Sequence, residues 1–207
     1  MADRIRRVAV LASGTGSNFR ALVENDTSPG EVVLLLSDRN DAGALSIARE
    51  LGIPHHVLDP GKYRTRFGIA EEEQWAEFLR DQKIDLVCLA GFMRILKGPL
   101  IEEFSGRLMN IHPSLLPAFP GLDGQGQAFT YGVKVAGCTV HYVDRGTDTG
   151  PVILQKAVPV LPDDTRDTLA ARILKKEHAI FSRAVSLHCA GRLRVSGRRV
   201  YITPDTQ

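Results

Sequence analysis

The chain has 207 residues, of which 43% are hydrophobic and 24% are charged, values close to those of an average globular protein. This composition predicts a packed core and excludes a chain that is disordered throughout. The 26 basic and 24 acidic residues give a formal net charge of +2, so the charge balance alone predicts neither a nucleic-acid nor a membrane partner.

The cysteines and the apolar runs indicate the compartment. No stretch approaches the ~20 apolar residues of a transmembrane helix, and the N-terminal residues lack a signal-peptide pattern. The three cysteines, Cys88, Cys138 and Cys189, lie far apart in apolar strings, which predicts buried free thiols in a reducing compartment. The close pair His55 and His56 has no partner cluster, so we predict a strand edge there and no metal site. We expect a cytoplasmic protein.

Strands and helices alternate in the first half of the chain. Short apolar runs predict buried strands, and apolar residues three and four positions apart predict helices. In chain order, we predict a strand at 8–12, a helix from 19–23, a strand at 32–36, a helix at 41–51, a strand at 55–58, a helix at 71–82 and a strand at 86–90. This alternation predicts an α/β fold with a single doubly wound, mostly parallel sheet and helices on both faces. Ligands of such sheets bind beyond the carboxyl ends of the strands.

The second half departs from strict alternation. The predicted elements are a strand at 108–111, a long loop at 114–126, a short helix at 127–131, strands at 138–143 and 152–158, a long helix at 165–190, and a closing hairpin of 193–195 with 199–202. A polar loop at 144–151 joins two of these strands and is longer than a hairpin needs, which is typical of a functional loop. No repeat or shift in composition predicts a domain boundary.

A glycine-rich turn at 13–18 joins the first strand to the first helix. The amides of a first helical turn lack internal partners and lie at the positive end of the helix dipole, so the turn predicts a phosphate site. A tight turn in which Ser17 or Asn18 caps the helix is the structural alternative. The turn has no P-loop lysine, and Phe19 stands where a dinucleotide fingerprint has its third glycine. Asp38, after the second strand, keeps an NAD-dependent oxidoreductase open.

The string NIHPSLLP at 110–117 carries the clearest sign of chemistry. Asn110 and His112 are two residues apart on a predicted strand, so both side chains point to the same side at its carboxyl end. An amide and an imidazole in that position can polarise a carbonyl group and move a proton. The alternative for His112 is a structural histidine with its hydrogen bonds satisfied.

Two acidic residues are further candidates. Asp148 lies in the polar loop and either caps a turn or supports His112 as its imidazolium form. Glu177 falls on the same face of the long helix as Leu174 and Phe181. An acid within an apolar stripe is costly to bury alone, so Glu177 either pairs with a basic residue or binds ligand hydroxyl groups.

Together these strings resemble the folate-dependent phosphoribosylglycinamide formyltransferases of purine biosynthesis, over nearly the whole chain. The matching strings are LASGTGSN at 11–18, LAGFMRIL at 89–96, LMNIHPSLLPAFPG at 108–121, TVHYVDRGTDTGPVILQ at 139–155 and KEHAIF at 176–181. The resemblance implies a formyltransferase-like, Rossmann-type fold. It implies one domain over 1–207, with a phosphate-binding half at about 1–100 and a half that carries catalysis and the folate loop at about 101–207.

The resemblance also implies a role for each matching residue. The implied catalytic residues are Asn110, His112 and Asp148. The implied substrate-binding residues are Gly16, Ser17 and Asn18 for the phosphate of glycinamide ribonucleotide and Glu177 for its ribose hydroxyls. The implied folate-binding residues are Arg66, Met93, Arg94, Ile95, Leu96, Asn110, Asp144, Arg145, Gly146, Thr147 and Asp148. The chain departs from the family at Leu174, where some relatives have lysine, and at 122–126, which is glycine-rich where relatives often have histidine.

The implied reaction is formyl transfer from the cosubstrate 10-formyltetrahydrofolate to the amine of 5'-phosphoribosylglycinamide. The amine attacks directly and gives a tetrahedral intermediate, whose oxyanion Asn110 and protonated His112 stabilise while Asp148 holds His112 charged. We expect no metal, small-molecule partners without nucleic acid or membrane, and a monomer or homodimer.

Several alternatives share parts of this pattern. A formyltetrahydrofolate deformylase has the same core but usually an added N-terminal domain, and a methionyl-tRNA formyltransferase needs a C-terminal RNA-binding domain. The first strand at about residue 7 and the last strand ending at 202 favour the nucleotide formyltransferase. A formyltransferase for another amine stays open. A folate- or phosphate-binding module without activity would leave the pairing of Asn110 with His112 unexplained.

Overall fold

Nine strands form one continuous sheet in the computed structural model, which describes residues 4–204. The strands are β1 (Arg6–Leu11), β2 (Gly30–Ser37), β3 (His55–Val57), β4 (Leu86–Leu89), β5 (Leu108–His112), β6 (Val135–Tyr142), β7 (Val152–Pro159), β8 (Leu193–Ser196) and β9 (Arg199–Ile202). Their order is β3-β2-β1-β4-β5-β6-β7-β9-β8. The first five are parallel, whereas β6 pairs antiparallel with β5 and β7. The predicted mostly parallel sheet is therefore confirmed, and it includes strands from both predicted halves of the chain.

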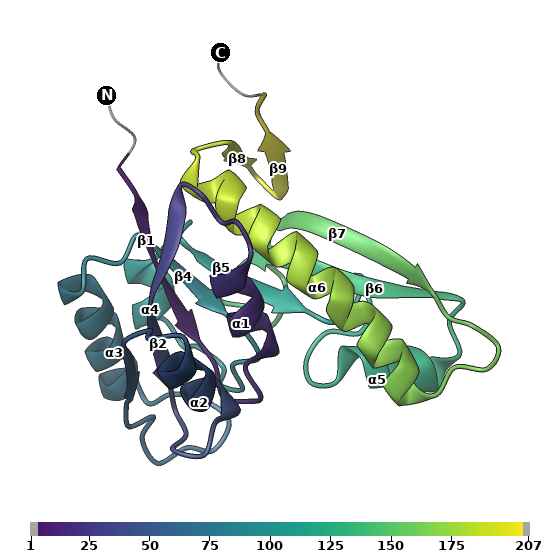
Figure 1. The fold of residues 1–207 in the computed structure, drawn as a ribbon, viewed down its shortest axis with the longest axis horizontal. Coiled ribbons are helices and arrows are strands. Elements are labelled where there is room, and N and C mark those ends of the chain that lie inside the picture. The colour runs from purple at the N-terminus through teal and green to yellow at the C-terminus, as the bar shows by residue number, and fades with distance from the viewer. Residues whose placement is uncertain (1–3, 205–207) are drawn as a thin grey trace.

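Helices cover both faces of this sheet, as predicted (Figure 1). The helices are α1 (Ser17–Glu24), α2 (Gly43–Glu50), α3 (Ile69–Asp81), α4 (Pro99–Glu103), α5 (Gly124–Tyr131) and α6 (Arg166–Cys189). Helices α1, α2 and α6 pack on one face, and α3 and α4 pack on the other. The long α6 crosses the sheet diagonally and ends beside the β8–β9 hairpin (Figure 1).

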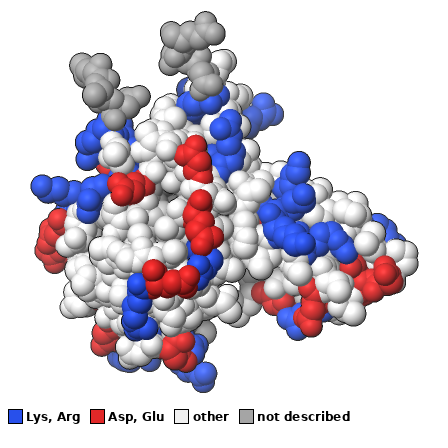
Figure 2. Space-filling view, viewed as in Figure 1, with Lys and Arg blue, Asp and Glu red and all other residues white. Residues whose placement is uncertain are grey.

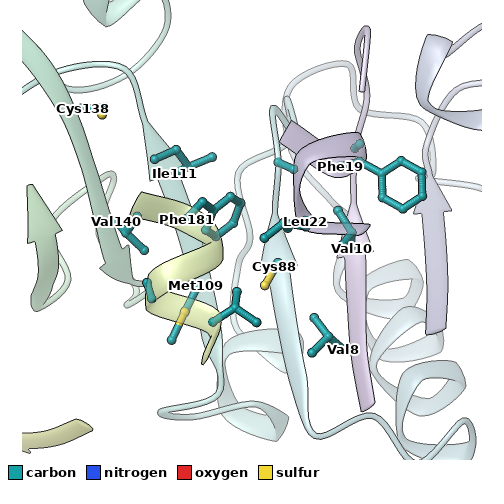
Figure 3. Close-up of a cluster of buried hydrophobic side chains, with 14 of the residues drawn as sticks. Val8, Val10, Phe19, Leu22, Cys88, Met109, Ile111, Cys138, Val140 and Phe181 are labelled. Carbon is teal, nitrogen blue, oxygen red and sulfur yellow. The ribbon is translucent and has the colours of Figure 1, made fainter. Parts of the chain in front are cut away.

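Side chains of β1 alternate between the two layers of the core. Val8 and Val10 pack with Phe19 of α1 and Phe181 of α6, in the cluster drawn in Figure 3. The intervening side chains, such as Leu11, pack with α3 and α4 on the other face. A strand that is buried on both faces has no polar positions to alternate with apolar ones, which explains the continuous apolar run seen in the sequence.

The strand order sets the position of the functional region. The chain runs outward from β1 to β2 and β3, and then returns to the other side of β1 with β4 and β5. The connections after β1 and β4 therefore diverge, and a crevice opens between the carboxyl ends of these strands. The glycine-rich turn follows β1, residues 91–96 follow β4, and His112 ends β5.

The predicted loop at 114–126 and the predicted helix at 127–131 need correction. Helix α5 begins three residues earlier, at Gly124, after Asp123 in the left-handed conformation with φ 59°. Glycines disfavour helix, so two of them in the first turn hid its start. A Cβ atom at Gly124 would lie 2.9 Å from Nε2 of His112, so this turn needs glycine in order to approach the histidine. The five-residue helix α4 was not predicted, because it is too short for a helical pattern.

The buried thiols and the surface charge agree with the sequence. The three cysteines are free and buried, as predicted, and burial raises the pKa of Cys138 and of Cys189 to about 12. His55 and His56 lie in β3 at the edge of the sheet, which confirms their predicted position. Charges of both signs are interspersed on the face that carries α1 and α6, with a local group of basic side chains near α6 (Figure 2). Within residues 4–204, no helix has the length and apolarity needed to cross a membrane.

Candidate active site

Three polar side chains converge at the carboxyl end of β5. Asn110 and His112 come from the strand itself, and Asp148 comes from the loop that follows β6. Oδ2 of Asp148 lies 3.4 Å from Nδ1 of His112, and its Oδ1 lies 3.5 Å from Nδ2 of Asn110. The pairing of β6 with β5 brings the loop over the end of β5, so residues 36 or more positions apart in sequence meet at one point.

Both ring nitrogens of His112 face hydrogen-bond acceptors. Nε2 lies 2.9 Å from the backbone carbonyl oxygen of Phe119 and must donate to it, while Nδ1 faces the carboxylate of Asp148. A neutral imidazole has one N–H group, whereas the imidazolium has two. The surroundings of His112 therefore fit the charged form, and its side chain is only 5% exposed.

The loop holds Asp148 in a defined position and in its ionised form. Asp148 adopts φ 55°, which is unusual for a residue other than glycine, and its Oδ2 accepts a hydrogen bond of 2.7 Å from the amide of Gly121. Burial raises the pKa of Asp148, but the contact with His141, the Gly121 amide and the charge of His112 together outweigh it, so the pKa lies below the usual range. A Cβ atom at Gly150 would lie 1.7 Å from the carbonyl oxygen of Tyr142, so glycine there lets the loop close tightly.

His141 belongs to the same cluster and was not singled out from the sequence. It stands opposite Asn110 in the antiparallel register of β5 and β6. Its Nδ1 donates to the carbonyl oxygen of Tyr142 at 2.8 Å, and its Nε2 lies 3.2 Å from Nδ2 of Asn110 and 3.6 Å from Asp148. The only sequence signal is its place three residues before the polar loop at 144–151, and that signal becomes specific only once the strand register is known.

The turn after β1 exposes the first amides of α1. Gly16 has φ 85° and is the N-cap residue, and no side chain caps the helix, so the capping alternative for Ser17 and Asn18 is wrong. A Cβ atom at Gly16 would lie 2.6 Å from Cα of Ala44, which explains the glycine. The amides of this turn thus keep their capacity to bind an anion.

Glu177 of α6 is joined to this turn. Nδ2 of Asn18 donates to its Oε2 at 2.7 Å, and the residue is 7% exposed. Burial raises the pKa of Glu177, and the hydrogen bond from Asn18 opposes that shift. No cation pairs with Glu177 within the described residues, so of the two alternatives the pairing with a basic residue is wrong.

These groups line two adjoining cavities. The first, of about 290 Å³, contains the catalytic candidates and most of the predicted folate-binding residues, namely Met93, Arg94, Ile95, Leu96, Asn110, Asp144, Gly146, Thr147 and Asp148. The second lies against α6 and is lined by Asn18, Leu174 and Glu177, whereas Gly16 and Ser17 lie outside its lining. Throughout residues 4–204, no cluster of three or more histidine, cysteine and acidic side chains is arranged to hold a metal ion.

The three predicted folate-binding arginines differ in their positions, because only Arg94 lines the first cavity. Arg66 lies outside the lining of the first cavity and stacks on the ring of Tyr63 at 3.7 Å, although its backbone bridges to Ile95 beside the cavity. Arg145 is exposed and pairs with Glu102. Arg94 lines the cavity, but its Nε donates to Oδ2 of Asp38 at 2.6 Å. The acid that an NAD site would use for ribose is therefore occupied by an ion pair.

The formyl transferase family profile matches residues 6–185. The chain belongs to the formyl transferase family. Its relatives include the phosphoribosylglycinamide formyltransferase of Bacillus subtilis, 45% identical over 84% of this chain and 90% of that protein. The trifunctional purine biosynthetic protein adenosine-3 of Drosophila melanogaster is 47% identical over 95% of this chain, which spans only 15% of the length of that relative.

Solved structures of this formyl transferase family have the same fold. Glycinamide ribonucleotide transformylase 1 from Symbiobacterium toebii superposes with a TM-score of 0.91 at 48% identity, covering 97% of this chain and 95% of that one. A formyltetrahydrofolate deformylase from Pseudomonas syringae pv. tomato is more distant, with 26% identity, a TM-score of 0.84, and coverage of 96% of this chain and 66% of that one. Within the family, the chain is therefore more similar to these nucleotide transformylases than to this deformylase.

Proposed function

We propose that this formyl transferase moves the formyl group of 10-formyltetrahydrofolate to the amine of 5'-phosphoribosylglycinamide, in de novo purine biosynthesis. The observation that carries the proposal is the convergence of Asn110, His112 and Asp148 on one cavity wall, beside a second cavity that Asn18 and Glu177 line. One reacting group can enter from each cavity, as a transfer between two substrates requires.

His112 and Asn110 are proposed to stabilise the oxyanion. In the reaction, the amine nitrogen forms a bond to the formyl carbon, and the bond from that carbon to the folate nitrogen then breaks. The imidazolium of His112 supplies positive charge where the formyl oxygen becomes negative. Nδ2 of Asn110 carries two N–H groups and lies 3.2 Å from Nε2 of His141 and 3.5 Å from Asp148. The contact with Asp148 is at the limit of a hydrogen bond, so one N–H group remains available to a nearer oxygen.

Asp148 is proposed to keep His112 charged and to move the proton. Its lowered pKa leaves it ionised at neutral pH, so it can stabilise the imidazolium 3.4 Å away. The attacking amine must lose a proton and the leaving folate nitrogen must gain one. Asp148, directly or through water, carries that proton between the two nitrogens, so no net proton is consumed.

The linings of the two cavities suit the two substrates. The first cavity combines apolar side chains, including Met93, Ile95 and Leu96, with the polar loop at Asp144–Asp148, which fits a flat heterocycle that carries hydrogen-bonding edges. The second cavity adjoins the free amides at the start of α1, which suit a phosphate, and Glu177, which can accept hydrogen bonds from ribose hydroxyls. We further propose the cytoplasm as the compartment, supported by the three free buried thiols, and a monomer or homodimer as the assembly.

The test is a formyl-transfer assay with purified protein, glycinamide ribonucleotide and 10-formyltetrahydrofolate. Release of tetrahydrofolate that requires the nucleotide, with one formylated nucleotide formed per tetrahydrofolate, would support the proposal. Equal release with and without the nucleotide would indicate a deformylase instead. Release that requires a different amine would keep the reaction but change the acceptor.

A further inference from the structure

The junction of the two cavities contains one polar side chain. Five residues line both cavities: Gly91, Met93, Ile111, Pro113 and Gln125. The other four offer only backbone, apolar atoms or the weakly accepting sulfur of Met93, so among the described residues at the junction the carboxamide of Gln125 is the only side chain that can make strong hydrogen bonds. The amine of one substrate has to meet the formyl group of the other at this junction.

The carboxamide of Gln125 has no hydrogen-bond partner within the described residues. Its Oε1 is buried without a donor, a costly arrangement for an amide oxygen. Other glutamine amides nearby are satisfied. Nε2 of Gln127 donates to the carbonyl oxygens of Pro120 and Leu122 at 3.0 and 2.9 Å, and Nε2 of Gln155 donates to the carbonyl oxygen of Leu116 at 2.8 Å. The open hydrogen-bonding capacity of Gln125 is therefore specific to this position.

The backbone that carries Gln125 is fixed relative to His112. Its neighbour Gly124 packs so closely that a Cβ atom there would lie 2.9 Å from Nε2 of His112. The next glycine, Gly126, packs against the carboxylate of Asp123 in the same way. The amide of Gln127 donates to the carbonyl oxygen of Asp123 at 2.9 Å and closes the first turn of α5. The tight turn thus fixes the backbone of Gln125, because the preceding residue, Gly124, packs directly against His112.

We propose that Gln125 binds the amine of the acceptor substrate and turns its lone pair toward the formyl carbon. This inference rests on the proposed function and adds a residue that selects the acceptor. A neutral amine has two N–H groups and one lone pair, so a carbonyl oxygen that accepts one N–H fixes the direction of the lone pair. Because the carboxamide makes no hydrogen bond to any residue of 4–204, rotation about its last bond can present the oxygen without breaking one.

The same carboxamide can distinguish an amine from other groups. A substrate that carries a hydrogen atom or a methyl group in place of the amine would leave the oxygen of Gln125 without a donor. Discrimination should therefore reside in the amine itself and not in the phosphate or ribose, which contact other parts of the second cavity. The contact between Gln125 and the amine can therefore be measured by changing the carboxamide on the protein and the amine on the ligand.

The experiment is a thermodynamic cycle in which one residue of the protein and one group of the ligand are changed separately and together. The dissociation constants are measured by titration calorimetry without folate. The two ligands are glycinamide ribonucleotide and the analogue in which hydrogen replaces the amine. We expect Gln125→Leu to weaken binding of glycinamide ribonucleotide about tenfold and to change binding of the analogue less than about twofold. Gln125→Glu keeps an acceptor and should keep the preference for the amine. Equal losses for both ligands in Gln125→Leu would overturn the proposal, as would loss of the preference in Gln125→Glu.

Gln127→Leu is the matched control on the same helix. The side-chain amide of Gln127 donates hydrogen bonds to two backbone carbonyl groups, and Gln127 lines neither cavity. We therefore expect Gln127→Leu to lower the midpoint of thermal unfolding and to leave the preference for the amine unchanged. Gln125→Leu removes no hydrogen bond and should unfold at the wild-type temperature. Failure of the proposed function is distinguishable, because the wild-type protein would then release no tetrahydrofolate in response to the nucleotide. Failure of this inference leaves that release intact.

Discussion

The cavity around His112 and the cavity beside Glu177 are built from different kinds of group. The first depends on side chains from separate parts of the chain, with the carboxylate of Asp148 3.4 Å from an imidazole. The second is lined by apolar side chains with Asn18, Gln125 and the buried acid Glu177, and neither lysine nor arginine is among the described residues that line it. Under the proposed function, this difference concentrates the charge pair where charge develops during the reaction and leaves the nucleotide mainly to neutral donors and acceptors.

Turnover should be more sensitive to the loss of a single group in the cavity around His112, the charged cavity, than in the cavity beside Glu177. Asp148→Asn keeps the size of the side chain and removes the charge that supports His112. We expect kcat to fall about 10²–10⁴-fold, the usual contribution of a residue that assists proton transfer. The measurement is steady-state kinetics with both substrates varied. Asp41→Asn, an exposed acid paired with Arg39 outside both cavities, is the control and should keep wild-type kcat. A loss below tenfold in Asp148→Asn would contradict the assigned role.

The same difference explains what the sequence could predict of the site. The glycine-rich turn is local, because its amides are fixed by the strand before it and the helix after it, and the prediction that it binds phosphate follows from those neighbours alone. Asn110 and His112 were also predictable, because strand spacing alone puts them on one side. The contact between His112 and Asp148 depends on the loop after β6 and on the Gly121 amide. Only the family resemblance indicated that contact before the structure.

Tertiary pairing also accounts for what the sequence missed. His141 joins the cluster because β6 pairs with β5 in a register that places it opposite Asn110. The partner of Glu177 is Asn18, 159 positions away, so helical periodicity indicated a buried acid without indicating what satisfies it. In the fold, long apolar runs and glycine stops predicted the strands and most helices. The start of α5 was hidden because packing against His112 requires glycine where helix propensity disfavours it.

Asn110 should contribute less than Asp148, because it acts as one neutral donor. We expect Asn110→Ala to lower kcat about 10²–10³-fold, the usual cost of removing an oxyanion donor, with a smaller change in the KM for either substrate. Binding of a folate analogue, followed by calorimetry, separates a lost donor from a disturbed cavity. If Asn110→Ala kept near-wild-type turnover, the oxyanion would have to be stabilised by His112 alone.

Phosphate binding in the second cavity can be tested by adding a positive charge, because the described residues that line it include neither lysine nor arginine. Leu174 lines this cavity, three positions before Glu177. We expect Leu174→Lys to lower the KM for glycinamide ribonucleotide about tenfold, as one charge-assisted hydrogen bond to phosphate would, and to make that KM more sensitive to salt. Leu174→Met changes shape without charge and serves as the control. An unchanged KM in Leu174→Lys would indicate that the phosphate binds elsewhere, and the contrast between the two cavities would lose its meaning.

The smallest expected effect is the dependence of stability on pH in the charged cavity. The pKa of Asp148 in the folded protein lies below its ordinary value of about 3.9, so the ionised carboxylate favours folding. This contribution is fully present above about pH 4 and is lost as the pH falls through the lower pKa of the folded state. We therefore expect the difference in unfolding temperature between the wild type and Asp148→Asn to be a few degrees near neutral pH and to shrink below about pH 4. A difference that stayed constant down to pH 2 would mean that Asp148 acts on stability through packing, and the charged pair would then matter for catalysis alone.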